Sequence, residues 1–280
     1  MNDFEMHYVA IMPSYICTLR CKLCIAGVPY YHNPIPTPVE RVKEYIERYF
    51  RIVTRVKKFT ISGGEPLLYE PMPEVLEFLR GYASRIGMLE ILTSGTVVPN
   101  EALLSAAKPF GDQFRFMIDN YGKQISQKVP EIDAILNRAG IQHIIRNYTK
   151  DDPHCGGWVD FGDLHQKKVH TQKEIEALYS KCIYPQKLRF ALTIHDGVMY
   201  PCPPVRKCSE WGIVSDYSEY IDLFDDSLTA EEQRRKILAI LNGKSLKACA
   251  YCNGMHADSP RFMPAEQLTR DEIKLIHRNA

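Results

Sequence analysis

Short apolar runs alternate with amphipathic segments through the first 150 residues, and this alternation limits the possible folds more than any other feature of the chain. Strands are expected where an apolar run ends at Gly, Pro or polar residues, and helices where apolar residues recur every three or four positions. The resulting strands are His7–Met12, Phe59–Ile61, Leu89–Thr93, Phe114–Ile118 and Ile141–Arg146. The helices between them are Val39–Val53, Pro73–Ser84, Asn100–Ala107 and Ile132–Arg138. This order predicts an α/β fold with a parallel sheet, either open or curved toward a barrel.

Polar and glycine residues follow each of the first four predicted strands. Three cysteines come after the first strand, Gly63-Gly64-Glu65 after the second, Ser94 after the third and Asp119 after the fourth. In open parallel sheets and in barrels alike, ligands bind at the carboxyl ends of the strands. The sequence therefore predicts one site built from these loops.

The composition is that of a folded protein with no electrostatic preference for nucleic acid or membrane. Of the 280 residues 45% are hydrophobic, and 35 basic residues nearly balance 34 acidic ones. No apolar run approaches the ~20 residues that span a bilayer, and the first residues lack the basic start of a signal peptide. We therefore expect a cytoplasmic protein that binds neither nucleic acid nor membrane.

The chain has nine cysteines. Because disulfides are rare in the cytoplasm, metal ligation is the better explanation for so many. The first three, Cys17, Cys21 and Cys24, have the spacing CxxxCxxC. Three thiolates on one loop can hold a [4Fe–4S] cluster and leave one iron open for a non-protein ligand. Zinc is the alternative, although it more often binds CxxC pairs together with two ligands from elsewhere.

The CxxxCxxC spacing, followed by Gly63-Gly64-Glu65-Pro66 after the second strand, resembles the motif pair of the radical S-adenosylmethionine (radical SAM) superfamily. One position departs from the pattern, since the family often has an aromatic residue before the last cysteine and this chain has Leu23. The resemblance covers residues 5 to 150 and implies a partial (βα)6 TIM-like barrel.

The resemblance also implies a cofactor and its chemistry. The open iron would chelate S-adenosylmethionine (SAM), and a flavodoxin- or ferredoxin-type donor would supply the electron that cleaves it to a 5′-deoxyadenosyl radical. That radical takes a hydrogen atom from the substrate. By the same resemblance, the residues around SAM would be Gly63, Gly64, Glu65, Pro66, Ser94, Asp119 and Arg146. For Ser94 and Arg146 the alternative is a polar residue at a strand end that faces water.

A second group of four cysteines lies in the last third of the chain, at Cys182, Cys202, Cys249 and Cys252. Cys182 is separated from Gly197 by fourteen residues, and Gly197 from Cys202 by four. Beside a radical SAM core, this spacing resembles the twitch domain, in which four cysteines close an auxiliary [4Fe–4S] cluster. A zinc ribbon is the alternative.

The expected domains are a radical SAM core at residues 1–165, a small α+β twitch domain at residues 170–260 and a helical tail at residues 261–280. Within the second domain, an Asp-Gly pair predicts a hairpin between Leu188–Ile194 and Val198–Tyr200. Thr229 and Glu232 form a possible capping box for a helix at Ala230–Leu241.

The reaction is expected by resemblance to radical SAM dehydrogenases of aminocyclitols, which have a similar length and the same short second domain. We expect oxidation of a secondary alcohol on a small polyol, sugar or aminocyclitol, with the auxiliary cluster as electron acceptor. Candidate catalytic residues are Arg146, Asp119, Cys155 and His154. One alternative is a radical epimerase of a sugar or peptide that uses Cys155 or Cys208 as hydrogen-atom donor. A ribosomal-peptide modifying enzyme is a further alternative, disfavoured because few residues precede Cys17.

Overall fold

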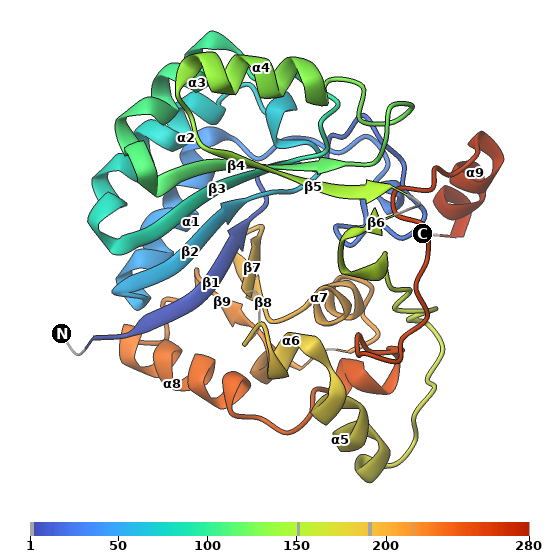
Figure 1. Cartoon of the computed structure of the whole chain (residues 1–280). Helices are drawn as coiled ribbons and strands as arrows, with labels where there is room; N and C mark the ends of the chain where they lie inside the picture. The colour runs from blue at the N-terminus through green and yellow to red at the C-terminus, as the bar shows by residue number, and fades with distance from the viewer. Residues whose placement is uncertain (1–2, 150–151, 190–191, 215, 280) are drawn as a thin grey trace. The chain divides into compact units, whose positions relative to one another are not determined.

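The computed structural model describes residues 3–149, 152–189, 192–214 and 216–279, and its chain divides into two compact units (Figure 1). Unit 1 contains Met1–Ala10, Glu47–Lys57 and Val159–Arg261, and unit 2 contains Ile11–Ile46, Lys58–Trp158 and Phe262–Ala280. The boundary passes through strands β1 (Glu5–Ile11) and β2 (Arg55–Ile61), so each unit holds part of both strands.

Unit 2 holds the parallel part of the sheet. Strands β3 (Ile86–Thr93), β4 (Phe114–Asn120) and β5 (His143–Thr149) pair in parallel, within the strand order β6-β5-β4-β3-β2-β1. The two-residue strand β6 (Asp152–Pro153) runs antiparallel to β5. The helices of this part of the chain are α1 (Val39–Ile52), α2 (Met72–Leu79), α3 (Glu101–Ala107), α4 (Val129–Ala139) and α9 (Arg270–Asn279). Its 3-10 helices are Val28–Tyr30, Pro66–Leu68, Arg80–Arg85, Lys108–Gln113 and His154–Gly156.

The helices of unit 2 form where the apolar period and the capping residues agree. Asn100 Oδ1 accepts a hydrogen bond from the Leu103 amide at 2.8 Å and caps α3. The helix α4 ends at Gly140, whose φ of 67° is easily reached by glycine. The predicted helix Pro73–Ser84 is wrong in its second half, because the α-helix ends at Leu79 and the chain continues as a 3-10 helix.

Burial of apolar side chains holds this sheet and its helices together. Figure 1 shows α2, α3 and α4 on the same side of strands β3, β4 and β5. Ile91, Phe116 and Ile118 on the strands and Leu76 and Leu136 on the helices are fully buried. Burying one such side chain stabilises a fold by about 1.5–3 kcal/mol. The predicted α/β class with a partial TIM-like barrel is confirmed.

Unit 1 contains the antiparallel strands β7 (Leu192–His195), β8 (Val198–Tyr200) and β9 (Ile221–Asp222), in the order β1-β7-β8-β9. The predicted hairpin is present, since Asp196 and Gly197 both have positive φ, as a two-residue type I′ turn requires. The first hairpin strand begins at Leu192 rather than at Leu188, and residues 190–191 of that prediction lie outside the described residues.

The helices of unit 1 are α5 (Gln172–Lys181), α6 (Ile183–Gln186), α7 (Pro203–Glu210) and α8 (Ala230–Leu241), with 3-10 helices at Tyr217–Glu219 and Lys247–Ala250. The predicted capping box of α8 is confirmed, because Thr229 Oγ1 accepts the Glu232 amide at 3.2 Å and Glu232 accepts the Thr229 amide at 2.8 Å.

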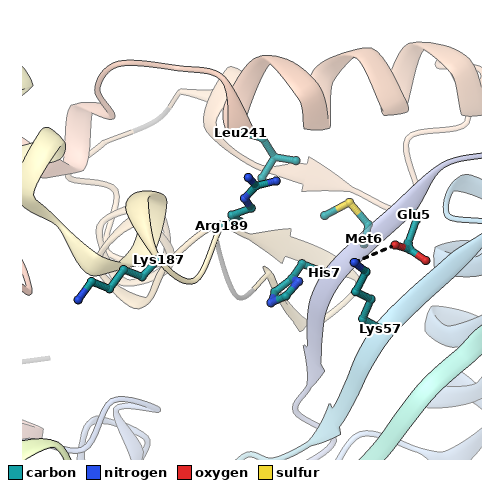
Figure 2. A pocket seen from close by; sticks show the side chains of 7 residues that line it. All are labelled: Glu5, Met6, His7, Lys57, Lys187, Arg189 and Leu241. Atoms are coloured by element: carbon teal, nitrogen blue, oxygen red, sulfur yellow. Dashed lines mark ion pairs between the residues drawn. The ribbon is translucent and has the colours of Figure 1, made fainter.

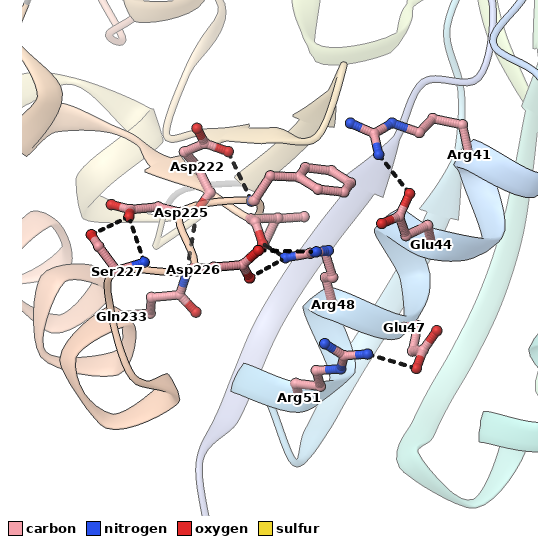
Figure 3. Close-up of polar contacts among 12 residues, drawn as sticks. Arg41, Glu44, Glu47, Arg48, Arg51, Asp222, Asp225, Asp226, Ser227 and Gln233 are labelled. Carbon is pink, nitrogen blue, oxygen red and sulfur yellow. Dashed lines mark hydrogen bonds and ion pairs between the residues drawn. The ribbon is translucent and has the colours of Figure 1, made fainter.

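An acidic loop after β9 is fixed to the end of α1 within unit 1 (Figure 3). The Arg48 guanidinium donates to Asp226 Oδ1 at 2.7 Å and to the Leu223 carbonyl at 3.1 Å, and it lies 4.2 Å from the ring centre of Phe224. Asp222 Oδ1 accepts the Phe224 amide at 2.8 Å. These carboxylates therefore shape a loop.

A cavity of about 400 Å³ in unit 1 is lined by Glu5, Met6, His7, Lys57, Lys187, Arg189 and Leu241 (Figure 2). Lys57 Nζ pairs with Glu5 Oε1 at 3.3 Å. Since residues 5–7 begin β1 and Lys57 lies early in β2, the cavity is at the amino-terminal ends of these strands. The predicted site residues follow the carboxyl ends instead. None of the described helices is both long enough and apolar enough to cross a membrane.

Candidate functional site

The loop after β1 carries the first three cysteines. Cys21 is buried, and Cys17 and Cys24 are half-buried beside a small apolar cluster of Met12, Tyr15, Ala26 and Val28. Burial raises the pKa of the Cys17 thiol to about 11 and that of Cys21 to about 12. Each of these thiols also lies within electrostatic range of Cys24, which raises both pKa values further. The three sulfur atoms are therefore brought together.

The surroundings of these sulfur atoms suit thiolates that bind a metal or a cluster. The Leu19 amide donates to Cys17 Sγ at 3.4 Å, and Gln267 Nε2 donates to Cys21 Sγ at 3.2 Å. Among the described residues, no set of three or more His, Cys, Asp or Glu side chains is arranged around a point that suits one metal ion. Cluster thiolates bind different irons and stand farther apart than the ligands of one ion. Three neighbouring thiols, two of which accept hydrogen bonds, fit the ligands of an iron–sulfur cluster.

Gly63 and Gly64 let the loop after β2 lie directly on the cysteine loop. The Gly64 amide donates to the Ser14 carbonyl at 2.8 Å, and the Glu65 amide donates to the Ile16 carbonyl at 2.8 Å. A Cβ atom on Gly63 would collide with the Ser14 carbonyl oxygen, and one on Gly64 with that of Ile16. Gly63 also has a φ of 135°, which side chains rarely allow. The close approach that these glycines permit is to the chain's own cysteine loop.

The Glu65 carboxylate is buried and accepts hydrogen bonds from three neighbours. Oε1 accepts the Thr93 hydroxyl at 2.7 Å and the Leu67 amide at 3.2 Å. Oε2 accepts the Ser94 amide at 2.9 Å and the Ser94 hydroxyl. Burial raises the pKa of Glu65, and these hydrogen bonds oppose the rise. Glu65 thus connects its own loop to the end of β3. Pro66 continues that loop as the 3-10 helix Pro66–Leu68.

Hydroxyl groups extend this contact back to the cysteine loop. Ser94 Oγ lies 2.9 Å from Thr96 Oγ1, which lies 2.7 Å from Thr18 Oγ1. Thr18 directly follows Cys17. Three loops, after β1, β2 and β3, are therefore connected through side chains at the carboxyl edge of the sheet.

Asp119 and Arg146 form a two-pronged ion pair at the ends of β4 and β5. Arg146 Nε donates to Asp119 Oδ1 at 2.6 Å, and Nη2 donates to Oδ2 at 2.9 Å. The pairing follows from the strand register, in which these two residues are direct neighbours. Burial raises the pKa of Asp119, and the guanidinium opposes this. Asp119 in turn raises the pKa of Arg146, although burial acts against its charge.

Aromatic side chains surround this ion pair. Tyr121 Oη donates to Asp119 Oδ2 at 3.2 Å, and its ring lies 5.3 Å from that of Tyr148 and 5.6 Å from that of Trp158. The His154 ring lies 5.3 Å from that of Tyr148. Burial raises the pKa of Tyr121, and both Asp119 and Cys21 add to this rise. Through Tyr121, the surroundings of this pair therefore reach the electrostatic range of Cys21.

Cys155 follows His154 in an exposed turn of the same unit. Its φ is 58°, a left-handed backbone that residues other than Gly, Asn and Asp seldom adopt. The thiol lies within electrostatic range of Tyr148. Asp160, another polar residue of this part of the sequence, instead accepts the Gly162 amide at 2.7 Å and closes a turn.

The residue pattern did not reveal several side chains that build this site. Ser126 Oγ donates to the Ser94 carbonyl at 2.7 Å and accepts the Tyr121 amide at 2.9 Å, which ties the loops after β3 and β4 together. Tyr121 follows the strand end directly, and that position was the available signal. Gln267 had no signal, because its contact with Cys21 joins positions 246 residues apart.

Unit 1 brings the second group of cysteines together. Cys182 follows α5, Cys202 precedes α7, Cys249 lies in the 3-10 helix Lys247–Ala250, and Cys252 follows it. Burial raises the pKa of Cys202 well above its usual value and those of Cys249 and Cys252 to about 12. Cys182 contributes to all three rises, as a close thiol does. The Tyr179 and Tyr184 hydroxyls lie within electrostatic range of these thiols.

Backbone amides point at these sulfurs as they do at the first group. The Gly254 amide donates to Cys252 Sγ at 3.2 Å. Hydrogen bonds from the backbone of Val205 and Leu246 act on Cys202 and Cys249 and oppose the rise of their pKa values. Such donors favour the thiolate form, and the four-sulfur set fits the ligands of a closed cluster. Cys208 is fully buried in α7, and burial raises its pKa to about 11.

Three comparisons relate the chain to known proteins. A GTP 3′,8-cyclase of Helicobacter pylori strain HPAG1 is 28% identical over 132 residues, which are 46% of this chain and 40% of that protein. An S-adenosylmethionine-dependent nucleotide dehydratase of Lacinutrix mariniflava is 26% identical over 121 residues, which are 40% of this chain and 23% of that protein. The aligned segments thus span less than half the length of these relatives.

The fold is also found in a solved structure. The structure of histidine-tagged anSMEcpe with bound AdoMet aligns over 98% of this chain and 97% of its own, with a TM-score of 0.51 and 13% identity. Residues 11–149 match the family model of the radical SAM superfamily. These residues include the CxxxCxxC loop, the Gly63–Pro66 loop and the Asp119–Arg146 pair. Through residues 11–149, just under half of its length, the chain is therefore similar to the radical SAM superfamily.

Proposed function

We propose that this chain is a radical SAM enzyme whose Cys17, Cys21 and Cys24 hold one [4Fe–4S] cluster. The observation that carries the proposal is the contact between the loops after β1 and β2, in which Glu65 is close enough to Cys17 to raise the pKa of its thiol. When bound, the cluster and SAM supply a 5′-deoxyadenosyl radical that takes one hydrogen atom from the substrate. SAM would lie along Gly63, Gly64, Glu65, Pro66, Ser94, Asp119 and Arg146.

The reaction that we propose is oxidation of a secondary alcohol on a small polyol, sugar or aminocyclitol. The alcohol carbon loses a hydrogen atom to the radical, the hydroxyl loses a proton to a base, and one electron leaves as the C=O double bond forms. Overall the substrate loses two electrons and SAM takes up two. The four thiols of unit 1 support this balance, because a second cluster there would accept the leaving electron.

His154 is the base in this proposal. Both oxygens of the Asp119 carboxylate already accept hydrogen bonds, from Arg146 and Tyr121. The His154 imidazole is exposed next to Tyr148 and lies within electrostatic range of Asp119. Imidazole exchanges a proton near neutral pH, which suits a base for an alcohol radical. Asp119 and Arg146 would position SAM or substrate, and the aromatic rings would exclude water.

The names of the two relatives support a sugar-like substrate. By their names these relatives act on nucleotides, and the ribose of a nucleotide carries secondary alcohols.

The proposed domains remain a radical SAM core at residues 1–165 and an auxiliary-cluster domain at residues 170–260. A flavodoxin- or ferredoxin-type donor would reduce the first cluster.

The test is iron content and SAM cleavage after anaerobic reconstitution. We expect about eight irons per chain, falling to about four in a Cys17→Ala/Cys21→Ala/Cys24→Ala variant that forms no 5′-deoxyadenosine. A Cys182→Ala/Cys249→Ala variant should keep 5′-deoxyadenosine formation but lose ketone formation. Cys208→Ala is the matched control, because this cysteine lies in the same unit and is not a proposed ligand. If the second site held zinc instead of four irons, it could not accept an electron, and the proposed oxidation would be refuted.

The second candidate is a radical epimerase, favoured by the strained and exposed Cys155. Its thiol would return a hydrogen atom to the substrate radical. Cys208 is less suited to this role, because it is fully buried in α7. Turnover in deuterated water distinguishes the two reactions. Deuterium in the product, lost in Cys155→Ala, would establish epimerisation, whereas a ketone formed equally by wild type and Cys155→Ala would establish oxidation.

A peptide-modifying enzyme is the remaining alternative. The fold is shared with anSMEcpe, which has been solved with AdoMet and a Kp18Cys peptide. Incubation with deuterium-labelled sugar alcohols and with peptides separates the two substrate classes, since only the true substrate transfers deuterium to 5′-deoxyadenosine.

A further inference from the structure

The segment 262–269, here called the strap, lies in unit 2, and its residues 266–268 run antiparallel to residues 20–22 of the cysteine loop. The Lys22 amide donates to the Glu266 carbonyl at 2.8 Å, and the Leu268 amide donates to the Arg20 carbonyl at 2.8 Å. Between these two hydrogen bonds, Gln267 is the bridge partner of Cys21. The strap thus lies against the middle cysteine of the first group.

The Gln267 side chain is fixed at both of its ends. Its Oε1 accepts the Arg20 amide at 2.7 Å. Its Nε2 donates to Cys21 Sγ at 3.2 Å and to the Ala265 carbonyl at 2.7 Å. Because the Arg20 backbone amide can only donate and the Ala265 carbonyl can only accept, the orientation of the side-chain amide is determined. One N–H of Gln267 is therefore directed at the sulfur of a proposed cluster ligand.

Other contacts hold the strap against the loop. Lys22 Nζ pairs with Glu266 Oε1 at 2.7 Å and with Glu272 Oε1 at 3.4 Å. In α9, His277 Nε2 lies 2.9 Å from the Pro29 carbonyl oxygen. Just before Gln267, Ala265 is fully buried and has a φ of 55°, an unfavourable backbone for alanine. The chain accepts this strain in the turn that presents Gln267 to Cys21.

We propose that Gln267 is a positioning residue of the first cluster and that its N–H···S hydrogen bond raises the cluster's reduction potential. The inference rests on the proposed function, because it requires a cluster on Cys21. A donor to a ligand sulfur stabilises the reduced form more than the oxidised form, since the reduced cluster carries more negative charge. Removing the donor therefore makes the cluster harder to reduce.

The test is a redox titration of the reconstituted protein, with the reduced cluster followed by electron paramagnetic resonance. In this titration a Cys182→Ala/Cys249→Ala background keeps the signal to the first cluster. Gln267→Leu removes the donor at nearly unchanged volume. Thr269→Val is the matched control, because it removes the hydrogen bonds between the Thr269 hydroxyl and Glu272 at the end of the strap, changes no charge and leaves Gln267 in place. We expect the potential to become more negative in Gln267→Leu and to stay at the wild-type value in Thr269→Val.

The other outcomes also decide the question. Loss of iron from Gln267→Leu but not from Thr269→Val supports the positioning role, because the hydrogen bond is then needed to hold the cluster. Iron loss from both variants, or a wild-type potential in a fully loaded Gln267→Leu, overturns it and leaves the strap a structural element. If the wild-type background takes up no iron, the proposed function itself fails, which separates the two failures.

Discussion

Thr18 and Thr96 share a hydrogen bond of 2.7 Å that joins the cysteine loop to the loop after β3. Thr96 also contacts Ser94, which binds Glu65, so one threonine connects the first cysteine to the glycine-rich loop. A substitution of Thr96 therefore tests how much these loops depend on one another.

Thr96→Val should remove two hydrogen bonds at nearly constant volume. We expect the free energy of unfolding to fall by about 1–2 kcal/mol, since a hydrogen bond contributes about 0.5–1.5 kcal/mol. Hydrogen exchange of residues 17–24 should become faster, as measured by mass spectrometry. Thr96→Ser keeps the hydroxyl and should behave like wild type. Unchanged exchange in Thr96→Val would show that the backbone contacts alone hold the loop.

Gly63→Ala should destabilise the protein by about 2–4 kcal/mol, through a strained φ and a collision with the Ser14 carbonyl. Urea denaturation measures the change, and reconstitution measures iron uptake, which should fall as well. Gly81→Ala is the control, because open space surrounds that position and its φ is not positive. Equal stability of the two variants would contradict the close packing of the two loops.

Asp119→Asn should leave the guanidinium of Arg146 without its partner. A partly buried pair broken in this way lowers the free energy of unfolding by about 2–4 kcal/mol. The double variant Asp119→Asn/Arg146→Met should be more stable than the sum of the two single changes implies, by about 1–3 kcal/mol. Denaturant titration of the four proteins gives the coupling. Additive effects would mean that the two residues act independently despite their contact.

The Asp216–Lys247 ion pair should make stability depend on acid pH. Lys247 Nζ lies 2.7 Å from Asp216 Oδ2, and with hydrogen bonds from Ser218 it lowers the pKa of Asp216 from 3.8 to about 2. Because the folded pKa is below the unfolded one, the stabilisation is complete above pH 4 and is lost as the pH falls toward 2. We expect Asp216→Asn to lose about 1 kcal/mol at pH 6, since solvent around the exposed lysine screens the pair. The difference from wild type should shrink between pH 4 and 3, and a constant difference would exclude this pair as its source.

Much of the fold followed from local sequence signals. The α8 helix has the predicted bounds because the Thr229–Glu232 capping box marks its start. The Asp196-Gly197 turn was readable because few other residue pairs adopt two positive φ values. The end of α2 was not readable, because the α-helix passes directly into the 3-10 helix Arg80–Arg85 and Arg80 keeps a right-handed helical backbone.

The site was predictable where it depends on motifs and not where it depends on register. The cysteine spacing and the Gly63-Gly64-Glu65-Pro66 loop are written in consecutive residues, and the structure brings the two loops into contact. The Asp119–Arg146 pair depends on which residues of β4 and β5 face each other, and a shift of one residue would separate them. The contact of Gln267 with Cys21 is set by the tertiary fold alone.

The contact between the strap and the cysteine loop also fixes an order of events during synthesis. Gln267 is added 246 residues after Cys21, a delay on the order of ten to fifty seconds at the usual speed of a ribosome. During that time the three thiols emerge without their final neighbours and are open to oxygen and stray metal ions. The cluster proposed for this loop would therefore meet its complete protein surroundings only after the strap has been synthesised.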